Sequence, residues 1–115
     1  MKPAYFQYEN GISAVDSGYV RHLHAAIHLI VENGRVALVD TGTNESLPRA
    51  EWALEQIGVG PEAVDYVIVT HVHLDHAGGA GAMMRAFPNA KLVVHPRGAR
   101  HMADPSKLIA GAAAV

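Results

Sequence analysis

The stretch VIVTHVHLDHAGG, residues 67–79, joins an apolar run directly to a dense group of polar side chains. Within six positions it places His71, His73, Asp75 and His76. Neutral imidazole and carboxylate are the usual ligands of zinc, and they also suit iron, manganese and nickel. A packing role is the alternative, but four polar side chains so close together leave few apolar atoms to bury. The stretch therefore predicts a metal site.

This ligand cluster begins where a predicted strand ends. The run DYVIVT, residues 65–70, is largely apolar and β-branched, which favours a strand. Residues two apart in an extended segment point the same way, so His71 and His73 can converge on one ion. Asp75 and His76 follow where the chain bends, and they face a neighbouring point. The carboxyl end of a strand is also where α/β proteins commonly build their sites.

The sequence before this stretch is typical of β-structure. Segments 5–8 and 12–18 are strand candidates, and segments 25–32 and 35–40 form a hairpin pattern around Asn33-Gly34, a pair that favours a tight two-residue turn. The run VALV in the last of these segments is apolar on both sides, which predicts a strand covered on both faces.

Beyond residue 43 the hydrophobic period changes to three and four residues, which predicts helices. The first helix carries Leu47, Ala50, Leu54 and Ile57 on one stripe. The second has Ala80, Met83, Met84 and Phe87 on one face. Segment 91–95 reads as another buried strand, residues 96–102 as a helical turn and residues 105–115 as a last helix. This order predicts an α/β or α+β fold, in which a mixed sheet carries helices on its outer face. For the first helix, Asn44 or Ser46 is the expected N-cap, and Gly58 or Gly60 the expected end.

Composition narrows the classes of function. The 115 residues suit one domain, and the formal charge of −2 offers no basic stripe, so nucleic acid is not favoured as a partner. The chain has no cysteine, which restricts metal ligands to His, Asp and Glu. No apolar segment approaches the ~20 residues that cross a bilayer, and residues 1–11 lack the apolar core of a signal peptide. We therefore expect a cytoplasmic protein that acts on a small molecule and does not bind membranes.

The motif THVHLDHAGG resembles the signature of the metallo-β-lactamase superfamily, which includes glyoxalase II-type thioester hydrolases. The upstream VALVDTG is similar to that family's strand and Asp-Thr-Gly turn, and the resemblance covers residues 25–95. It implies that residues 1–115 are the N-terminal part of a single domain, half of an αββα sandwich. The complete site would hold two zinc ions, with iron or manganese as alternatives.

The resemblance also implies roles for individual residues. His71 and His73 match ligands of the first metal, whereas Asp75 and His76 match ligands of the second. Asp75 would in addition orient the attacking hydroxide, which makes it the candidate catalytic residue. Asp40 matches the acidic residue that supports the metal loop from behind and fixes ligand orientation.

The remaining ligands of that family have no match here. His95 and His101 come too early in the sequence, and we interpret them as surface or capping residues. His22 and His24 are expected to be exposed, while His28 is a candidate for the floor of the site. The glycine-rich HAGGAGA is not a phosphate-binding loop, because no Gly-Lys-Ser/Thr follows; its small residues fit a backbone that passes close to the metals and the sheet.

Three readings of function remain open. The first is a metal-dependent hydrolase of ester, thioester or lactone bonds. The second is a metal-binding half-domain or scaffold that is active only with a second chain. The third is a di-iron redox member of the same fold. The sequence stops inside a predicted helix, AGAAAV, so we expect a piece of a longer domain. The apolar faces of such a half-sandwich would associate, which predicts a homo-oligomer.

Overall fold

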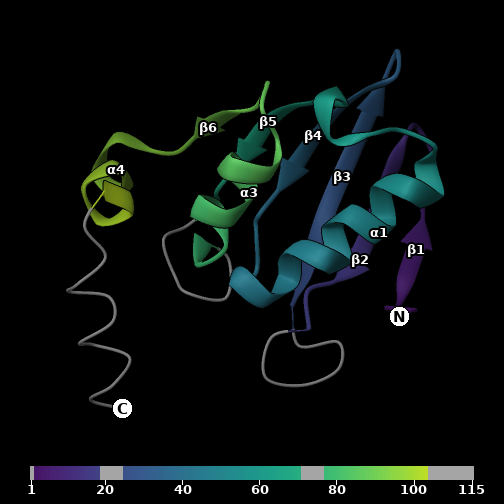
Figure 1. The fold of residues 1–115 in the computed structure, drawn as a ribbon, viewed down its shortest axis with the longest axis horizontal. Helices are drawn as coiled ribbons and strands as arrows, with labels where there is room; N and C mark the ends of the chain where they lie inside the picture. Colours follow the sequence, from purple (N-terminus) through teal and green to yellow (C-terminus); the bar gives the residue numbers. More distant parts are fainter. Residues whose placement is uncertain (1, 19–24, 71–76, 104–115) are drawn as a thin grey trace.

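The computed structural model describes residues 2–18, 25–70 and 77–103, with side chains described up to residue 99. The described strands form one six-stranded sheet in the order β1-β2-β3-β4-β5-β6 (Figure 1). Strands β1 to β4 pair antiparallel, whereas β4, β5 and β6 pair parallel. The predicted mixed sheet is therefore confirmed. The strands are β1 (Tyr5–Gln7), β2 (Ile12–Asp16), β3 (Ala26–Glu32), β4 (Arg35–Val39), β5 (Val64–Ile68) and β6 (Lys91–Val93).

The turn between β3 and β4 confirms the prediction made from Asn33-Gly34. Asn33 has a φ of 52° and Gly34 a φ of 75°, and a tight hairpin turn with this twist requires positive φ at both central positions. The turn between β1 and β2 uses the same pair of residue types, Asn10 with a φ of 61° and Gly11 with a φ of 76°. Local turn chemistry thus helps to fix the register of β1 with β2 and of β3 with β4.

Helix α1 follows β4 after a short polar segment. A 3₁₀ turn, Asn44–Ser46, precedes the helix, so Ser46 is its N-cap, although Ser46 makes no side-chain capping hydrogen bond. Gly58 ends the helix in the left-handed conformation, with a φ of 89°, as a C-terminal glycine commonly does. None of the helices in the described ranges is long and apolar enough to cross a membrane. The elements are α1 (Leu47–Ile57), α3 (Ala80–Ala86), α4 (Pro96–Ala103) and the 3₁₀ turns Asn44–Ser46 and Pro61–Ala63.

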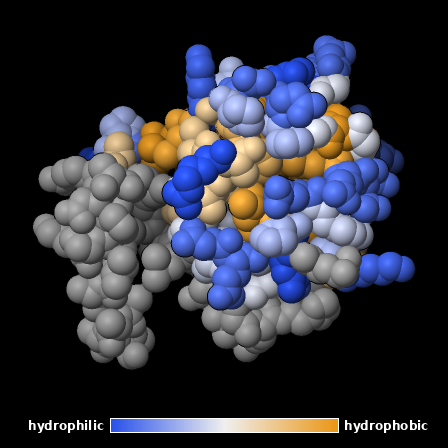
Figure 2. Space-filling view, viewed as in Figure 1, coloured by the Kyte–Doolittle hydropathy of each residue, from blue (hydrophilic) through white to orange (hydrophobic). Residues whose placement is uncertain are grey.

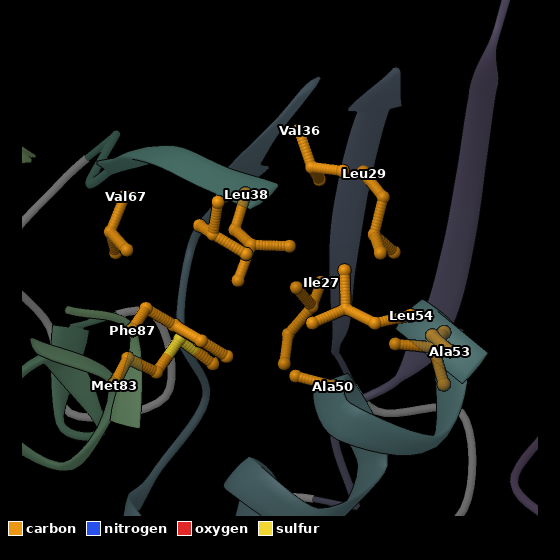
Figure 3. Packing of buried hydrophobic residues seen from close by; sticks show 12 residues of the cluster. Ile27, Leu29, Val36, Leu38, Ala50, Ala53, Leu54, Val67, Met83 and Phe87 are labelled. Carbon is orange, nitrogen blue, oxygen red and sulfur yellow. The ribbon is translucent and has the colours of Figure 1, made fainter. Parts of the chain in front are cut away.

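The core lies between the sheet and a layer formed by α1 and α3. Ile27, Leu29 and Leu38 project from the sheet toward Leu54 of α1, and Phe87 and Met83 fill the space beside β5 (Figure 3). All of these side chains are buried. Trp52 of α1 packs edge-on against Tyr5 with ring centroids 5.5 Å apart, and both rings lie against the core. Over α1 the outer surface is mainly hydrophilic (Figure 2).

The opposite face of the sheet carries apolar side chains that no described element covers. Ile12, Ile30 and Tyr66 are exposed there, and Val39 is half-buried. The prediction that VALV is covered on both faces is therefore wrong for the described part of the chain. The predicted buried strand at residues 91–95 is also corrected, because β6 is an edge strand whose first and last residues are exposed.

Candidate metal centre

The carboxyl ends of β4 and β5 lie side by side because these strands are parallel neighbours. Asp40 directly follows β4, and Thr70 comes two residues after β5. The predicted ligands His71, His73, Asp75 and His76 follow Thr70 in the sequence and lie outside the described residues. The structure therefore describes the residues before and after the predicted metal segment, which we call its frame.

Asp40 forms the first part of that frame. Its side chain is buried, and its Oδ1 accepts a hydrogen bond from the Thr70 backbone N–H at 2.9 Å. The Thr70 hydroxyl donates to the same carboxylate, with oxygen–oxygen distances of 2.8 and 2.9 Å to Oδ1 and Oδ2. Asp40 thus holds the residue that immediately precedes His71. The geometry agrees with the supporting role implied by the resemblance, while the ligand assignments stay predictions.

The backbone of Asp40 adopts a conformation that few residues tolerate. Its φ is 67°, in the left-handed region where Asp and Asn are among the least unfavourable non-glycine residues. The Asp40 N–H donates to the Ile68 carbonyl at 2.7 Å, which continues the pairing of β4 with β5. The left-handed turn redirects the chain immediately after this bond. A short side chain with two acceptor oxygens therefore suits the position for both backbone and side-chain reasons.

The next residues of the turn, Thr41 and Gly42, contact Gly79, which follows the predicted metal segment in the sequence. The Gly79 backbone N–H donates to the Gly42 carbonyl at 2.9 Å and to Thr41 Oγ1 at 3.0 Å. Thr41 is completely buried. No role was predicted for Thr41. A close backbone approach was predicted for the glycine-rich segment, and Gly79 makes one to this turn, whereas the predicted approach to the metals stays a prediction.

Buried polar side chains concentrate at this edge of the sheet. The Ser46 hydroxyl donates to the Ser17 carbonyl at 2.6 Å and accepts the Thr43 N–H at 3.1 Å, which ties the turn to the end of β2. A side chain at Gly42 would overlap those of Ser46 and Ser17, so only glycine fits. Of the buried polar residues described, all but Ser13 belong to this region: Asp16, Ser17, Asp40, Thr41 and Ser46.

Asp16 adds a buried carboxylate to the same edge. Its Oδ1 accepts the Gly18 N–H at 3.2 Å, and Arg49 Nη1 of α1 lies 3.5 Å from its Oδ2. The Asp16 side chain is 1% exposed and that of Arg49 is 30% exposed. A buried carboxylate requires such compensation, because an unpaired charge is costly in the interior. The cationic side chain thus links α1 to the end of β2.

Among the histidines outside the predicted cluster, the structure describes the side chains of His28 and His95. His95 precedes α4, is exposed, and accepts the Arg97 N–H on its Nδ1 at 3.1 Å, so its predicted capping role is confirmed. His101 lies within α4. His28 is exposed and pairs with Val39 across β3 and β4, one residue from Asp40, whereas His22 and His24 lie outside the described residues. Among the residues that the structure describes, no three His, Asp or Glu side chains form a metal-binding group.

The chemistry of the predicted donors fits a divalent metal. Three imidazoles and one carboxylate match the nitrogen and oxygen ligands that zinc and iron take in proteins. The described frame fits as well, since Thr70 and Gly79 hold the segment at both ends. The residues present are therefore compatible with a metal site at this edge.

Comparison with known proteins identifies the family. The family model of the metallo-beta-lactamase superfamily matches residues 21–114. The chain belongs to this superfamily, as its fold and motif indicated. The structure is similar to that of the Rm3 metallo-beta-lactamase, with a TM-score of 0.74 and 25% identity over 89% of this chain and 36% of that one. The α+β fold is thereby confirmed.

Two curated relatives have different names within this family. The chain is 41% identical over 69 residues to a coenzyme F420H(2) oxidase of Methanothermobacter marburgensis, a match that covers 56% of this chain and 17% of the relative. It is 29% identical over 93 residues to the N-acyl homoserine lactonase AttM of Azorhizobium caulinodans, covering 64% of this chain and 32% of that relative. The chain thus spans a third or less of these relatives.

Proposed function

We propose that the chain contributes to a metal-dependent hydrolase that cleaves an ester, thioester, lactone or similar bond. The observation that carries the proposal is the hydrogen bonding of the buried Asp40 carboxylate to Thr70. Thr70 directly precedes the HxHxDH motif, and the chain belongs to a superfamily with that motif. A support of this kind fixes the orientation of ligands in metal sites. The buried polar network around the turn would keep that support in place.

In the proposed site, His71 and His73 bind one ion, and Asp75 and His76 bind a second. When bound, the metal ions would lower the pKa of a bound water to about 7. They would also supply positive charge that stabilises the developing oxyanion. Asp75 would orient the attacking water through its carboxylate. Asp40 would remain behind the ligands and hold the Thr70 backbone that leads into them.

The substrate class rests on weaker support. The named lactonase among the relatives acts on an acyl homoserine lactone, which favours an acyl bond over other substrates. The named coenzyme F420H(2) oxidase supports a redox alternative with two iron ions on the same ligand set. A non-catalytic scaffold is the third candidate.

The number of ligands argues that residues 1–115 form the N-terminal part of a larger site. Two histidines would serve the first ion, whereas catalytic zinc usually has three protein ligands. The apolar sheet face with Ile12, Ile30 and Tyr66 also lacks a covering layer among the described elements. We therefore propose that a second layer completes both the sandwich and the site, and that this chain alone forms a homo-oligomer through that face. A strictly monomeric chain in light scattering at high concentration would contradict the oligomer.

Metal analysis tests the proposal. We expect the purified protein to contain zinc by mass spectrometry. His73→Ala should lower the zinc content and, in protein that carries the completing layer, the esterase or lactonase turnover. His95→Ala is the matched control, because His95 caps α4 and is not a predicted metal ligand. Iron in place of zinc would favour the redox alternative, and protein that takes up no metal would favour the scaffold.

A further inference from the structure

The turn Asp40–Thr43 contacts the chain on both sides of the predicted metal segment. It holds Thr70 through the Asp40 carboxylate and Gly79 through Thr41 Oγ1 and the Gly42 carbonyl. We propose that this turn is a two-ended clamp that holds Thr70 and Gly79, and that Thr41 is a positioning residue for metal binding by the sequence between them. The inference rests on the proposed metal site and adds a residue that neither the motif nor the resemblance assigns.

Gly79 shows how close the second contact is. Its φ is −90°, so its backbone conformation is open to any residue. A Cβ at this position would nevertheless lie 2.5 Å from the Thr43 carbonyl oxygen and 2.7 Å from that of Thr41. Both obstacles are backbone atoms, which cannot rotate away as a side chain would. Glycine is therefore required because the two segments are pressed together.

The clamp itself is firmly anchored. Thr41 is fully buried, and Ser46 fastens the turn to the end of β2 by the bonds described above. The two holding residues, Asp40 and Thr41, are neighbours in the sequence, so one hydrogen-bonded turn sets the separation between Thr70 and Gly79. Fixing both ends of a short segment reduces the conformational freedom that metal binding must remove. Loosening one end should therefore weaken metal binding without unfolding the sheet.

Thr41→Val tests the clamp, because valine keeps the buried volume and removes one of the two oxygens that accept the Gly79 N–H. We expect zinc affinity, measured by competition with a chromophoric chelator, to fall roughly 10-fold or more, as for other residues that orient metal ligands. Thr41→Ser retains the oxygen and should bind zinc nearly as well as the unaltered protein. Urea unfolding of the metal-free variants shows whether a lower zinc affinity reflects lost positioning or a general loss of stability.

A matched pair of glycine substitutions provides the second test. Gly79→Ala introduces the backbone clash, whereas Gly81→Ala in α3 adds a Cβ that meets only the Arg85 guanidinium, at 3.5 Å. We expect weaker zinc binding from the first and unchanged zinc binding from the second. Zinc affinity unchanged in both Thr41→Val and Gly79→Ala, in protein that binds zinc, would overturn the clamp and leave the metal site standing.

Amide exchange decides the clamp even if the proposed metal site fails. In metal-free protein, the Gly79 amide proton should exchange slowly, and Thr41→Val should accelerate its exchange. Gly79 exchange that is equal in the two proteins would overturn the clamp. Absence of zinc uptake by the unaltered protein would instead refute the proposed metal site, and accelerated Gly79 exchange would then still support the clamp geometry.

Discussion

Substitution of Asp40 should separate the contribution of its carboxylate from that of its backbone conformation. The carboxylate accepts hydrogen bonds from two donors of Thr70, and a hydrogen bond to a charged group contributes about 1.5–3 kcal/mol. Thr70 is exposed, so water can replace part of what is lost, and the lower end applies. We expect Asp40→Gly to lower the free energy of unfolding by about 3 kcal/mol.

Asp40→Ala should cost about 1 kcal/mol more than Asp40→Gly, because alanine is strained at a φ of 67° and glycine is not. Asp40→Asn tolerates the same φ and keeps one acceptor oxygen, so it should be the mildest of the three. Asn33→Ala, at an exposed turn residue with a φ of 52°, is the control for backbone strain alone.

Urea unfolding followed by fluorescence of the single tryptophan, Trp52, measures the series, since that ring packs against Tyr5 in the native state. An unfolding midpoint for Asp40→Gly equal to that of the unaltered protein would refute the assigned contribution of the carboxylate. A midpoint for Asp40→Ala above that of Asp40→Gly would refute the strain assigned to the backbone.

Two further predictions concern regions away from the turn. Phe87 is fully buried beside Met83, so Phe87→Ala should lower the free energy of unfolding by about 3–5 kcal/mol, whereas Phe87→Leu should cost less than about 1.5 kcal/mol; equal urea midpoints would contradict this packing. The hydrogen bond from Arg35 lowers the pKa of the Asp65 carboxyl. A lowered folded-state pKa means stabilisation that is present above the ordinary carboxyl pKa and lost as pH falls through the lowered value. Asp65→Asn should therefore be slightly less stable than the unaltered protein at neutral pH and equal to it in strong acid, and a difference that grows on acidification would reverse the assignment.

Much of the fold could be predicted because its signals are local. The Asn33-Gly34 turn, the stripe of Leu54 and its neighbours, and the glycine that ends α1 each depend on residues close in sequence. The errors concerned what covers a strand. Val39 and Tyr66 belong to apolar runs. An apolar side chain indicates that burial is favourable but does not say which element buries it, and no described element of this chain covers these two.

The site divides in the same way. Asp40 could be singled out because its Asp-Thr-Gly turn resembles that of the family, and His95 because its position came too early for the family's third histidine. Thr41 could not, since its contact with Gly79 joins residues 38 positions apart through a backbone N–H and leaves no pattern in either segment. The pair Gly78-Gly79 is a weak signal, because glycine is also an ordinary N-cap residue and Gly79 is the N-cap of α3.

The change from antiparallel to parallel pairing at β4 bears on how the protein folds. Strands β1 to β4 are joined in sequence order with antiparallel pairing, whereas β5 reaches β4 only after the chain has passed through α1. Pairings between distant segments form late because closing a long loop is entropically unfavourable. Asp40 belongs to the early hairpins and Thr70 to the late strand, so we expect their hydrogen bond to form after the folding transition state. Asp40→Asn should then accelerate unfolding and leave the refolding rate unchanged, and a slowed refolding phase in stopped-flow fluorescence would show instead that the two segments meet early.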